Sequence, residues 1–151
     1  MLVGAGVEFW IFKCNPDYYR LADRMQDPRT DITWLVQQHR SEIAAGHTAF
    51  IWRTGDDRGI VGVLRVDSSP QVLPDDDDPF DIGETEQSDY RVRATIIDRH
   101  FFLGRATLRA TTGLENLSVF RRGRIQMGTN FPVTSSEGRT LLDLIAASKA
   151  S

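Results

Sequence analysis

The sequence predicts an α+β domain in which a small mixed β-sheet curls into a barrel and a few helices cover it. Its 151 residues suffice for one hydrophobic core and are too few for two independent domains. A composition of 40% apolar and 26% charged residues is typical of a globular protein. Strand-like runs dominate the middle of the chain and a capped helix follows them, so we expect one domain over residues 1–151.

The amino-terminal part is expected to hold two strands separated by a helix. Aromatic and β-branched residues predict strands at 9–12 and 31–36. Asn15 as N-cap and Pro16 at the first helical position predict a helix that runs to about Met25.

A hairpin is the clearest signal of the next segment. A helical turn at 41–45 is expected to end at Gly46, because glycine readily adopts the left-handed conformation. Residues 48–53 and 59–66 then form two apolar runs joined by a short polar turn, which is typical of paired antiparallel strands.

The remaining elements follow from turn signals and periodicity. They are expected, in chain order, as a long excursion at 68–89 that holds the acidic loop 75–89, a strand at 90–102, a helix with turns at 103–117, a strand at 118–124, a loop at 128–132 and a helix at 134–148. Thr134 and Glu137 have the spacing of a capping box at the start of the last helix.

Charge is distributed unevenly along the chain, which has a net charge of −3. Eight of the 21 acids fall within 75–89, where there is no base, so the rest of the chain holds 18 bases and 13 acids. Sixteen of those bases are arginines, which suit planar contacts to phosphate or carboxylate. This bias indicates an anionic partner, or else arginines that only decorate a solvated surface.

Several functional classes lack support in the sequence. We expect a cytoplasmic protein, because there is no apolar run of about 20 residues and no basic region ahead of an amino-terminal apolar one. Cys14 and the three histidines do not have zinc-ligand spacing, so no metal or other cofactor is expected. Motifs of hydrolases, P-loop proteins and metalloproteases are absent, so we expect a binding module.

Six pieces of the chain resemble EVE domains of the PUA-like superfamily, which are related in fold to the YTH domains that read methylated RNA. In order, they are Phe9 to Asp17, Ile32 to Trp34, Ser41 to Gly46, Phe50 to Gly55, Gly59 to Val63 and Gly128 to Phe131. The resemblance implies a PUA-like barrel. The Gly128 to Phe131 stretch and the Ile51 to Gly55 stretch are most similar to EVE domains found beside nucleases in bacterial modification-dependent restriction systems. The chain departs from the family at His47, where an aspartate is usual, and in its long acidic loop.

The resemblance implies a nucleic-acid partner and an aromatic pocket for a modified base. Trp34 matches the pocket tryptophan of the family; the alternative is a core tryptophan. The other pocket candidates are Arg53, Trp52, Lys13, Cys14, Asn15, Tyr18, Phe80 as a lid, and Asn130. Trp52 and Arg53 are neighbours on a strand, so they point to opposite faces and one of them is expected in the core. Asn15 also has its capping role, and Asn130 also suits a turn.

Contacts to the nucleic-acid backbone are expected from two groups of arginines. These are Arg91 and Arg93, which share a strand face, and the cluster Arg121, Arg122 and Arg124. Alternatively, these arginines pair with the acidic loop of the same molecule.

We therefore expect a module that binds a modified cytosine, such as 5-methylcytosine or 5-hydroxymethylcytosine, flipped from DNA, as the specificity part of a restriction system. A nuclease partner or a fused domain would cut the DNA. The alternatives are a reader of modified RNA and a small enzyme that acts on nucleotides through Lys13, Cys14 and nearby acids.

Overall fold

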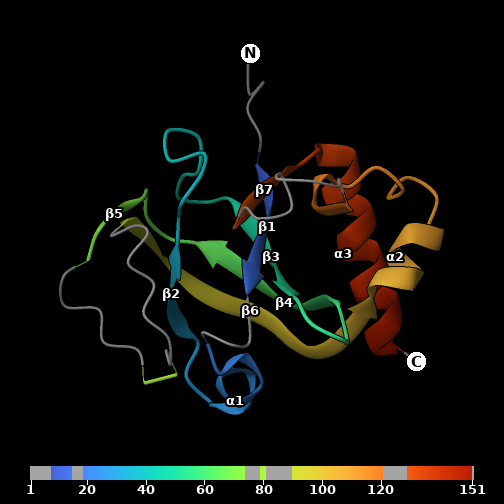
Figure 1. The fold of residues 1–151 in the computed structure, drawn as a ribbon, viewed down its shortest axis with the longest axis horizontal. Coiled ribbons are helices and arrows are strands. Elements are labelled where there is room, and N and C mark those ends of the chain that lie inside the picture. The colour runs from blue at the N-terminus through green and yellow to red at the C-terminus, as the bar shows by residue number, and fades with distance from the viewer. Residues whose placement is uncertain (1–7, 15–18, 74–78, 81–89, 121–128, 151) are drawn as a thin grey trace.

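The computed structural model of the chain describes residues 8–14, 19–73, 79–80, 90–120 and 129–150 (Figure 1). Its elements are β1 (Phe9–Cys14), α1 (Leu21–Gln26), β2 (Asp31–Leu35), β3 (Thr48–Arg53), β4 (Gly59–Val66), β5 (Gln71–Val72), β6 (Tyr90–Gly104), α2 (Arg105–Ala110), the 3-10 helix η1 (Ser118–Phe120), β7 (Asn130–Val133) and α3 (Ser135–Ala150). The predicted α+β class is confirmed. Of the acidic loop, only Pro79 and Phe80 belong to the described residues.

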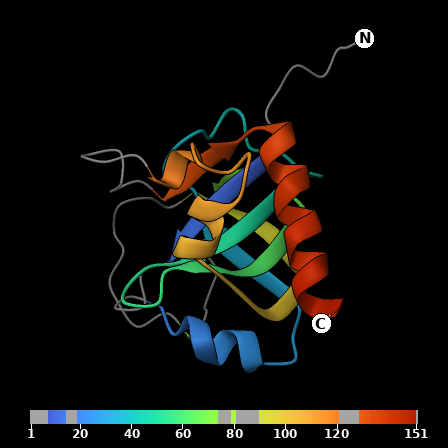
Figure 2. The ribbon, with the colours of Figure 1, turned by 90° about the vertical axis from the view of Figure 1, so that its right-hand side faces the viewer.

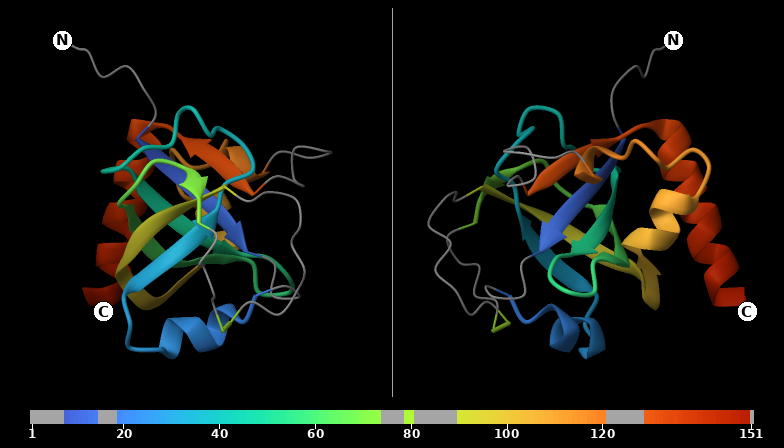
Figure 3. Two further views of the ribbon diagram at one scale, coloured as in Figure 1. Left: turned by 90° about the vertical axis from the view of Figure 1, so that its left-hand side faces the viewer. Right: turned by 45° about the vertical axis from the view of Figure 1, so that its right-hand side comes forward.

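All seven strands belong to one mixed sheet. Its order is β2-β6-β4-β3-β1-β7, and β5 pairs with β6. The β1–β3 pair is parallel and the other pairs are antiparallel. The sheet curls, as the two views of Figure 3 show. Within the described residues no backbone ladder joins the edge strands β2 and β7, so the expected barrel is a curled, open sheet.

Side-chain amides connect these two edges instead. The Oδ1 atom of Asn130 accepts hydrogen bonds from the backbone amides of Gln37 (2.8 Å) and Gln38 (3.3 Å), and its Nδ2 donates to the carbonyl of Leu35 (3.1 Å). The Oε1 atom of Gln38 accepts from the amides of Thr129 (2.8 Å) and Asn130 (3.0 Å). We call this set of hydrogen bonds the seam, because it does for β2 and β7 what a ladder does for adjacent strands.

The central strands separate two hydrophobic cores. On β1, Trp10 and Phe12 point to one face and Ile11 to the other, as the two-residue period of a strand requires. The inner core lies on the Trp10 side, inside the curl, and α1 contributes Leu21 and Met25 to it. The outer core lies between the opposite face and the elements α2, η1, β7 and α3, of which α2 and α3 are in front in Figure 2.

The strands at 9–12, 31–36 and 90–102, the hairpin and the last helix are all confirmed, with small shifts at their ends. The capping box is present: the amide of Glu137 donates to Oγ1 of Thr134 (3.1 Å), and the amide of Thr134 donates to Oε1 of Glu137 (3.0 Å). Gly46 has a φ of 94°, so it takes the expected left-handed conformation.

Three expectations were wrong within the described residues. Helix α1 begins only at Leu21, because Arg20 has the non-helical ψ of 69°. Ser118–Phe120 is a 3-10 turn that directs two consecutive side chains into the outer core, which a strand does not do. Asn130–Val133 is a strand and not a loop; it tolerates Pro132 because it lies at the edge of the sheet. The short strand β5 was not expected.

The unusual His47 holds the loop between β2 and β3. Its Nδ1 atom accepts hydrogen bonds from Nε1 of Trp10 (3.1 Å) and from the amide of Ala44 (3.2 Å). An indole N–H and a backbone N–H can only donate, so Nδ1 must accept and carries no proton. The imidazole is therefore neutral, with its proton on Nε2. Burial lowers the pKa of His47, and the charge of Glu8 opposes that shift.

Candidate nucleic-acid interface

Trp34 lies in the inner core and keeps only 6% of its surface exposed. Strand β2 places it opposite Val92 of β6, so its side chain points into the curl of the sheet. One side of the indole faces Phe12, with ring centroids 6.3 Å apart and planes at 25°. The ring of Tyr19 lies 6.1 Å away at a tilt of 56°. Trp34 is therefore enclosed by aromatic rings in this structure.

Tyr19 is the partly exposed member of this group. It packs against the inner core from the segment just before α1, whereas Phe12 is fully buried on β1. Cys14 belongs to the same core, so two predicted pocket residues, Trp34 and Cys14, lie on the same side of the sheet. Of the two rings beside the indole, Phe12 lies on a strand and is fully buried, whereas Tyr19 is only partly buried.

Phe80 is held against the start of α1. Its carbonyl accepts a hydrogen bond from the amide of Arg20 (2.7 Å), and the guanidinium of Arg20 lies 5.6 Å from the centre of its ring. Since Arg20 follows Tyr19 directly, Phe80 contacts the residue next to Tyr19. This position is compatible with the lid expected from the sequence.

Trp52 lies on the other side of the sheet. It is 3% exposed in the outer core, and its ring meets Phe120 edge to face at 6.0 Å. The structure therefore does not bring Trp52 together with Trp34, and one pocket cannot be lined by both.

Asn130 is buried and uses its side chain within the protein. The seam occupies both acceptor positions of Oδ1 and one hydrogen of Nδ2. The side chain thus fixes β2, the strand of Trp34, and does not present a free edge to a base.

Lys13 also points away from Trp34. Its Nζ atom lies 5.6 Å from the ring centre of Phe131 on the outer-core side. Burial lowers the pKa of Lys13, and the positive charge of Arg58 lowers it further.

Arg53 lies at the end of β3, beside the turn to β4. Its Nε atom donates to the carbonyl of Asp57 (2.9 Å), and its guanidinium carbon lies 5.0 Å from the ring centre of Phe102. The amide and Oγ1 of Thr54 both donate to the carbonyl of Cys14 at 3.1 Å. The turn is therefore tied to the end of β1, where the sequence predicts contacts to the base edge.

Phe102 is 48% exposed although it is large and apolar. Its ring covers Gly59 and Gly104, which are paired across β4 and β6. A Cβ atom at Gly59 would lie 2.3 Å from the carbonyl oxygen of Leu103 and 2.9 Å from the Phe102 ring, so only glycine fits there.

Two of the five arginines predicted to contact the nucleic-acid backbone belong to the described residues. Arg93 is exposed and Arg91 half-buried on the outward face of β6, whereas Val92 and Ala94 point into the inner core. This confirms the expected alternation of the strand. Arg121, Arg122 and Arg124 lie outside the described residues, as do the pocket candidates Asn15 and Tyr18.

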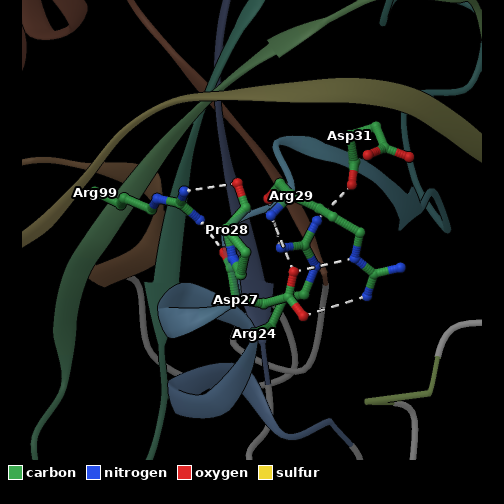
Figure 4. Close-up of polar contacts among 6 residues, drawn as sticks. All are labelled: Arg24, Asp27, Pro28, Arg29, Asp31 and Arg99. Atoms are coloured by element: carbon green, nitrogen blue, oxygen red, sulfur yellow. Dashed lines mark hydrogen bonds and ion pairs between the residues drawn. The ribbon is translucent and has the colours of Figure 1, made fainter.

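A second set of arginines contacts residues 27–31, the segment that follows α1 (Figure 4). Arg24 is 2% exposed and donates to the carbonyls of Arg29 (2.9 Å) and Asp31. Arg99 donates to the carbonyl of Asp27 (2.6 Å). Arg29 pairs with the carboxylate of Asp27 at 3.0 Å, and this side-chain hydrogen bond helps to hold the pKa of Asp27 below its usual value. These guanidinium groups hold the 27–31 segment in place.

In the described part of the chain, no group of three His, Cys, Asp or Glu side chains is arranged to hold a metal ion. No helix there combines the length and the apolarity needed to cross a membrane.

The sequence model of a family described as the EVE domain matches residues 8–144. The chain belongs to the EVE domain family. Among curated protein sequences, none matches this EVE domain.

Solved structures share its fold. A hypothetical protein from Leishmania major has a TM-score of 0.66 at 16% identity, over 94% of this chain and 96% of that one. A protein from Pseudomonas syringae has a TM-score of 0.63 at 22% identity, over 90% and 98%. Human THYN1, in complex with DNA that contains 5-methylcytosine, has a TM-score of 0.62 at 19% identity, over 90% and 96%.

Sequence reasoning singled out Arg53 but missed Arg58 and Phe102 beside the β3–β4 turn. Arg58 was not singled out because an arginine in a polar turn carries no signal by itself, and Phe102 was taken as the end of a strand. Two signals pointed to them: the glycines Gly59 and Gly104, which leave room for a ring, and the short spacing between Arg53 and Arg58.

Proposed function

We propose that this EVE domain is a nucleic-acid-binding module that accepts a modified base, favouring a modified cytosine flipped from DNA. The observation that carries the proposal is the grouping of Trp34, Tyr19 and Cys14 on one side of the sheet, with Phe80 at the neighbouring start of α1. Family membership supports it, and so does the fold shared with human THYN1, whose structure is a complex with DNA that contains 5-methylcytosine.

The base would stack on the indole of Trp34 after Tyr19 moves aside. Stacking on an aromatic ring contributes about 1 to 3 kcal/mol and favours every base in a similar way. Tyr19 is suited to this movement because its side chain is only partly buried. Phe80 would then cover the base from the side of α1.

Selectivity needs more than the methyl group. Burying one methyl contributes about 0.8 kcal/mol, which corresponds to about a fourfold preference. A larger preference requires polar contacts, because a buried donor or acceptor left without a partner costs about 1 to 3 kcal/mol. We assign these contacts to the end of β1, around Cys14 and Asn15.

In the cell, the domain would supply the specificity of a modification-dependent restriction system. We assign no catalytic step to it, and cleavage would come from a nuclease partner or a fused domain.

The test is a binding panel of otherwise identical oligonucleotides. They carry cytosine, 5-methylcytosine, 5-hydroxymethylcytosine, glucosylated cytosine or N6-methyladenine, each as DNA duplex and single strand, with methylated RNA as a further arm. We expect the tightest binding for one modified cytosine in duplex DNA, and loss of that preference in Trp34→Ala. Equal affinity for all bases contradicts the proposal, and a preference for RNA transfers the site to an RNA reader.

A further inference from the structure

The turn between β3 and β4 carries two arginines held in the same way. Nε of Arg53 donates to the carbonyl of Asp57 (2.9 Å), and Nε of Arg58 donates to the carbonyl of Gly55 (3.0 Å). Each guanidinium is thus fixed by one nitrogen to the main chain of its own turn. Within the described residues, the Nη atoms of both have no hydrogen-bond partner, and neither arginine has a carboxylate within ion-pair distance.

The surroundings of the turn favour an anionic partner. The guanidinium carbon of Arg53 lies 5.0 Å from the centre of the Phe102 ring, so this contact restricts the rotamers of Arg53 before a partner binds. The amide of Arg105 donates to the carbonyl of Arg58 (2.9 Å), which attaches the turn to α2. On α2, the guanidinium of Arg109 lies 5.2 Å from the ring centre of Phe120, and no carboxylate among the described residues pairs with it.

The charges at this surface are unequal. Asp56 and Asp57 are the acids of the turn, whereas Arg53, Arg58, Arg105 and Arg109 are the bases of the turn and of α2. The fifth nearby cation is Lys13, whose pKa is lowered by its burial and by the charge of Arg58. Basic residues therefore outnumber acidic ones at the surface formed by the β3–β4 turn and α2.

The position of the turn relates it to the proposed base site. Thr54 binds the carbonyl of Cys14 through both its amide and its hydroxyl, so the turn begins next to the end of β1. A strand whose base enters beside Cys14 would continue across residues 53–58. Guanidinium nitrogens bind phosphate oxygens through charge-assisted hydrogen bonds.

We propose that Arg53 and Arg58 form a phosphate clamp that holds the nucleic-acid backbone next to the inserted base. This inference rests on the proposed function. It assigns Arg53 to the backbone and not to the base edge. It also makes the β3–β4 turn a backbone contact separate from Arg91 and Arg93.

The salt dependence of binding tests the clamp. Each phosphate contact contributes about −0.9 to the slope of log K against log salt for duplex DNA. We expect Arg53→Gln and Arg58→Gln each to make this negative slope shallower by about 0.9, and the double variant to make it shallower by about 1.8. Affinity should fall equally for methylated and unmodified duplexes. Arg53→Lys keeps the charge and should restore the slope. The matched control is Arg29→Gln, since Arg29 is exposed and already paired with Asp27, and its slope should equal that of the wild type.

The outcomes separate the clamp from the reader. An unchanged slope in the folded double variant, checked by circular dichroism, overturns the clamp even when 5-methylcytosine is still preferred. Failure of the unaltered chain to prefer any modified base overturns the proposed function first. A competition experiment adds poly-glutamate to the protein–DNA complex. If it displaces the DNA as well as unmodified DNA does at equal charge, the clamp is overturned too, because the surface would then fit an acidic protein partner.

Discussion

Trp34 and Trp52 lie on opposite sides of the same curled sheet, and their surroundings differ. Trp52 is covered by the outer core, to which α2, η1, β7 and the 16-residue α3 all contribute. Trp34 has the buried ring of Phe12 beside it and the partly exposed ring of Tyr19, which lies just before the six-residue α1. Both indoles are buried, but Trp34 meets the partly exposed ring of Tyr19 whereas Trp52 meets the buried ring of Phe120. The exposed fraction alone therefore does not distinguish the two tryptophans; the rings beside them do.

The largest expected effect is on stability and concerns Trp52 in the outer core. Trp52→Ala should lower the free energy of unfolding by about 3 to 5 kcal/mol, because it leaves a cavity beside Phe120 in the outer core. Urea denaturation followed by circular dichroism measures this. Trp52→Phe, which keeps a ring, should cost clearly less. A loss below about 1 kcal/mol for the alanine variant would remove the distinction between the two sides.

The next effect concerns the seam, which joins the strand of Trp34 to the outer core. Asn130→Ala should cost about 2 to 3 kcal/mol, because it removes three hydrogen bonds to the main chain of residues 35–38. Asn130→Asp retains the acceptor oxygen but buries a carboxylate whose second oxygen faces the carbonyl of Leu35, so we expect a loss at least as large in the same denaturation experiment. Should Asn130 instead bind the base, the alanine variant would weaken binding and leave stability unchanged.

A smaller effect is expected on the side of Trp34. Tyr19→Ala should cost about 1 kcal/mol, since the ring is only partly buried. It should also increase the quenching of tryptophan fluorescence by acrylamide, because Trp10 and Trp52 stay enclosed while one face of Trp34 opens. Tyr90→Ala is a suitable control, as that ring is exposed and faces Arg40. Quenching that does not change would show that Tyr19 does not cover the indole.

The smallest effect is the pH dependence from His47, which holds Trp10 on the same side as Trp34. The folded state lowers the pKa of His47 below the ordinary value of 6.5, so the unfolded chain takes up the proton first. Stability should be full above pH 6.5 and should fall as the pH drops from there towards the lowered pKa. His47→Asn offers a neutral acceptor and should lack this decline. Identical pH profiles for both proteins would refute the assignment of the acceptor.

Much of the fold was predictable because its signals are local. Three signals each specify the conformation of their own segment: Gly46, the capping box of Thr134 and Glu137, and the alternation along 90–102. Strand β7 was not predictable in this way: Pro132 argues locally against a strand, and only its place at the edge of the sheet beside β1 makes it acceptable.

The candidate site depends more strongly on long-range contacts. Periodicity separated Trp52 from Arg53, but it did not show which cluster receives each side chain. The role of Asn130 in the seam arises from contacts with residues more than 90 positions away. The clamp arginines depend on two carbonyls of the turn, whose directions the sequence does not encode in any simple pattern.

The most direct measurement is of base extrusion beside Trp34. A duplex with 2-aminopurine next to 5-methylcytosine reports unstacking of that neighbour as an increase in fluorescence, while anisotropy of a terminal dye reports binding. We expect the increase with the unaltered chain on the methylated duplex, and no increase with Trp34→Ala or with the unmodified duplex. Binding by anisotropy without that increase, or the same increase with Trp34→Ala, would contradict insertion of a base beside Trp34.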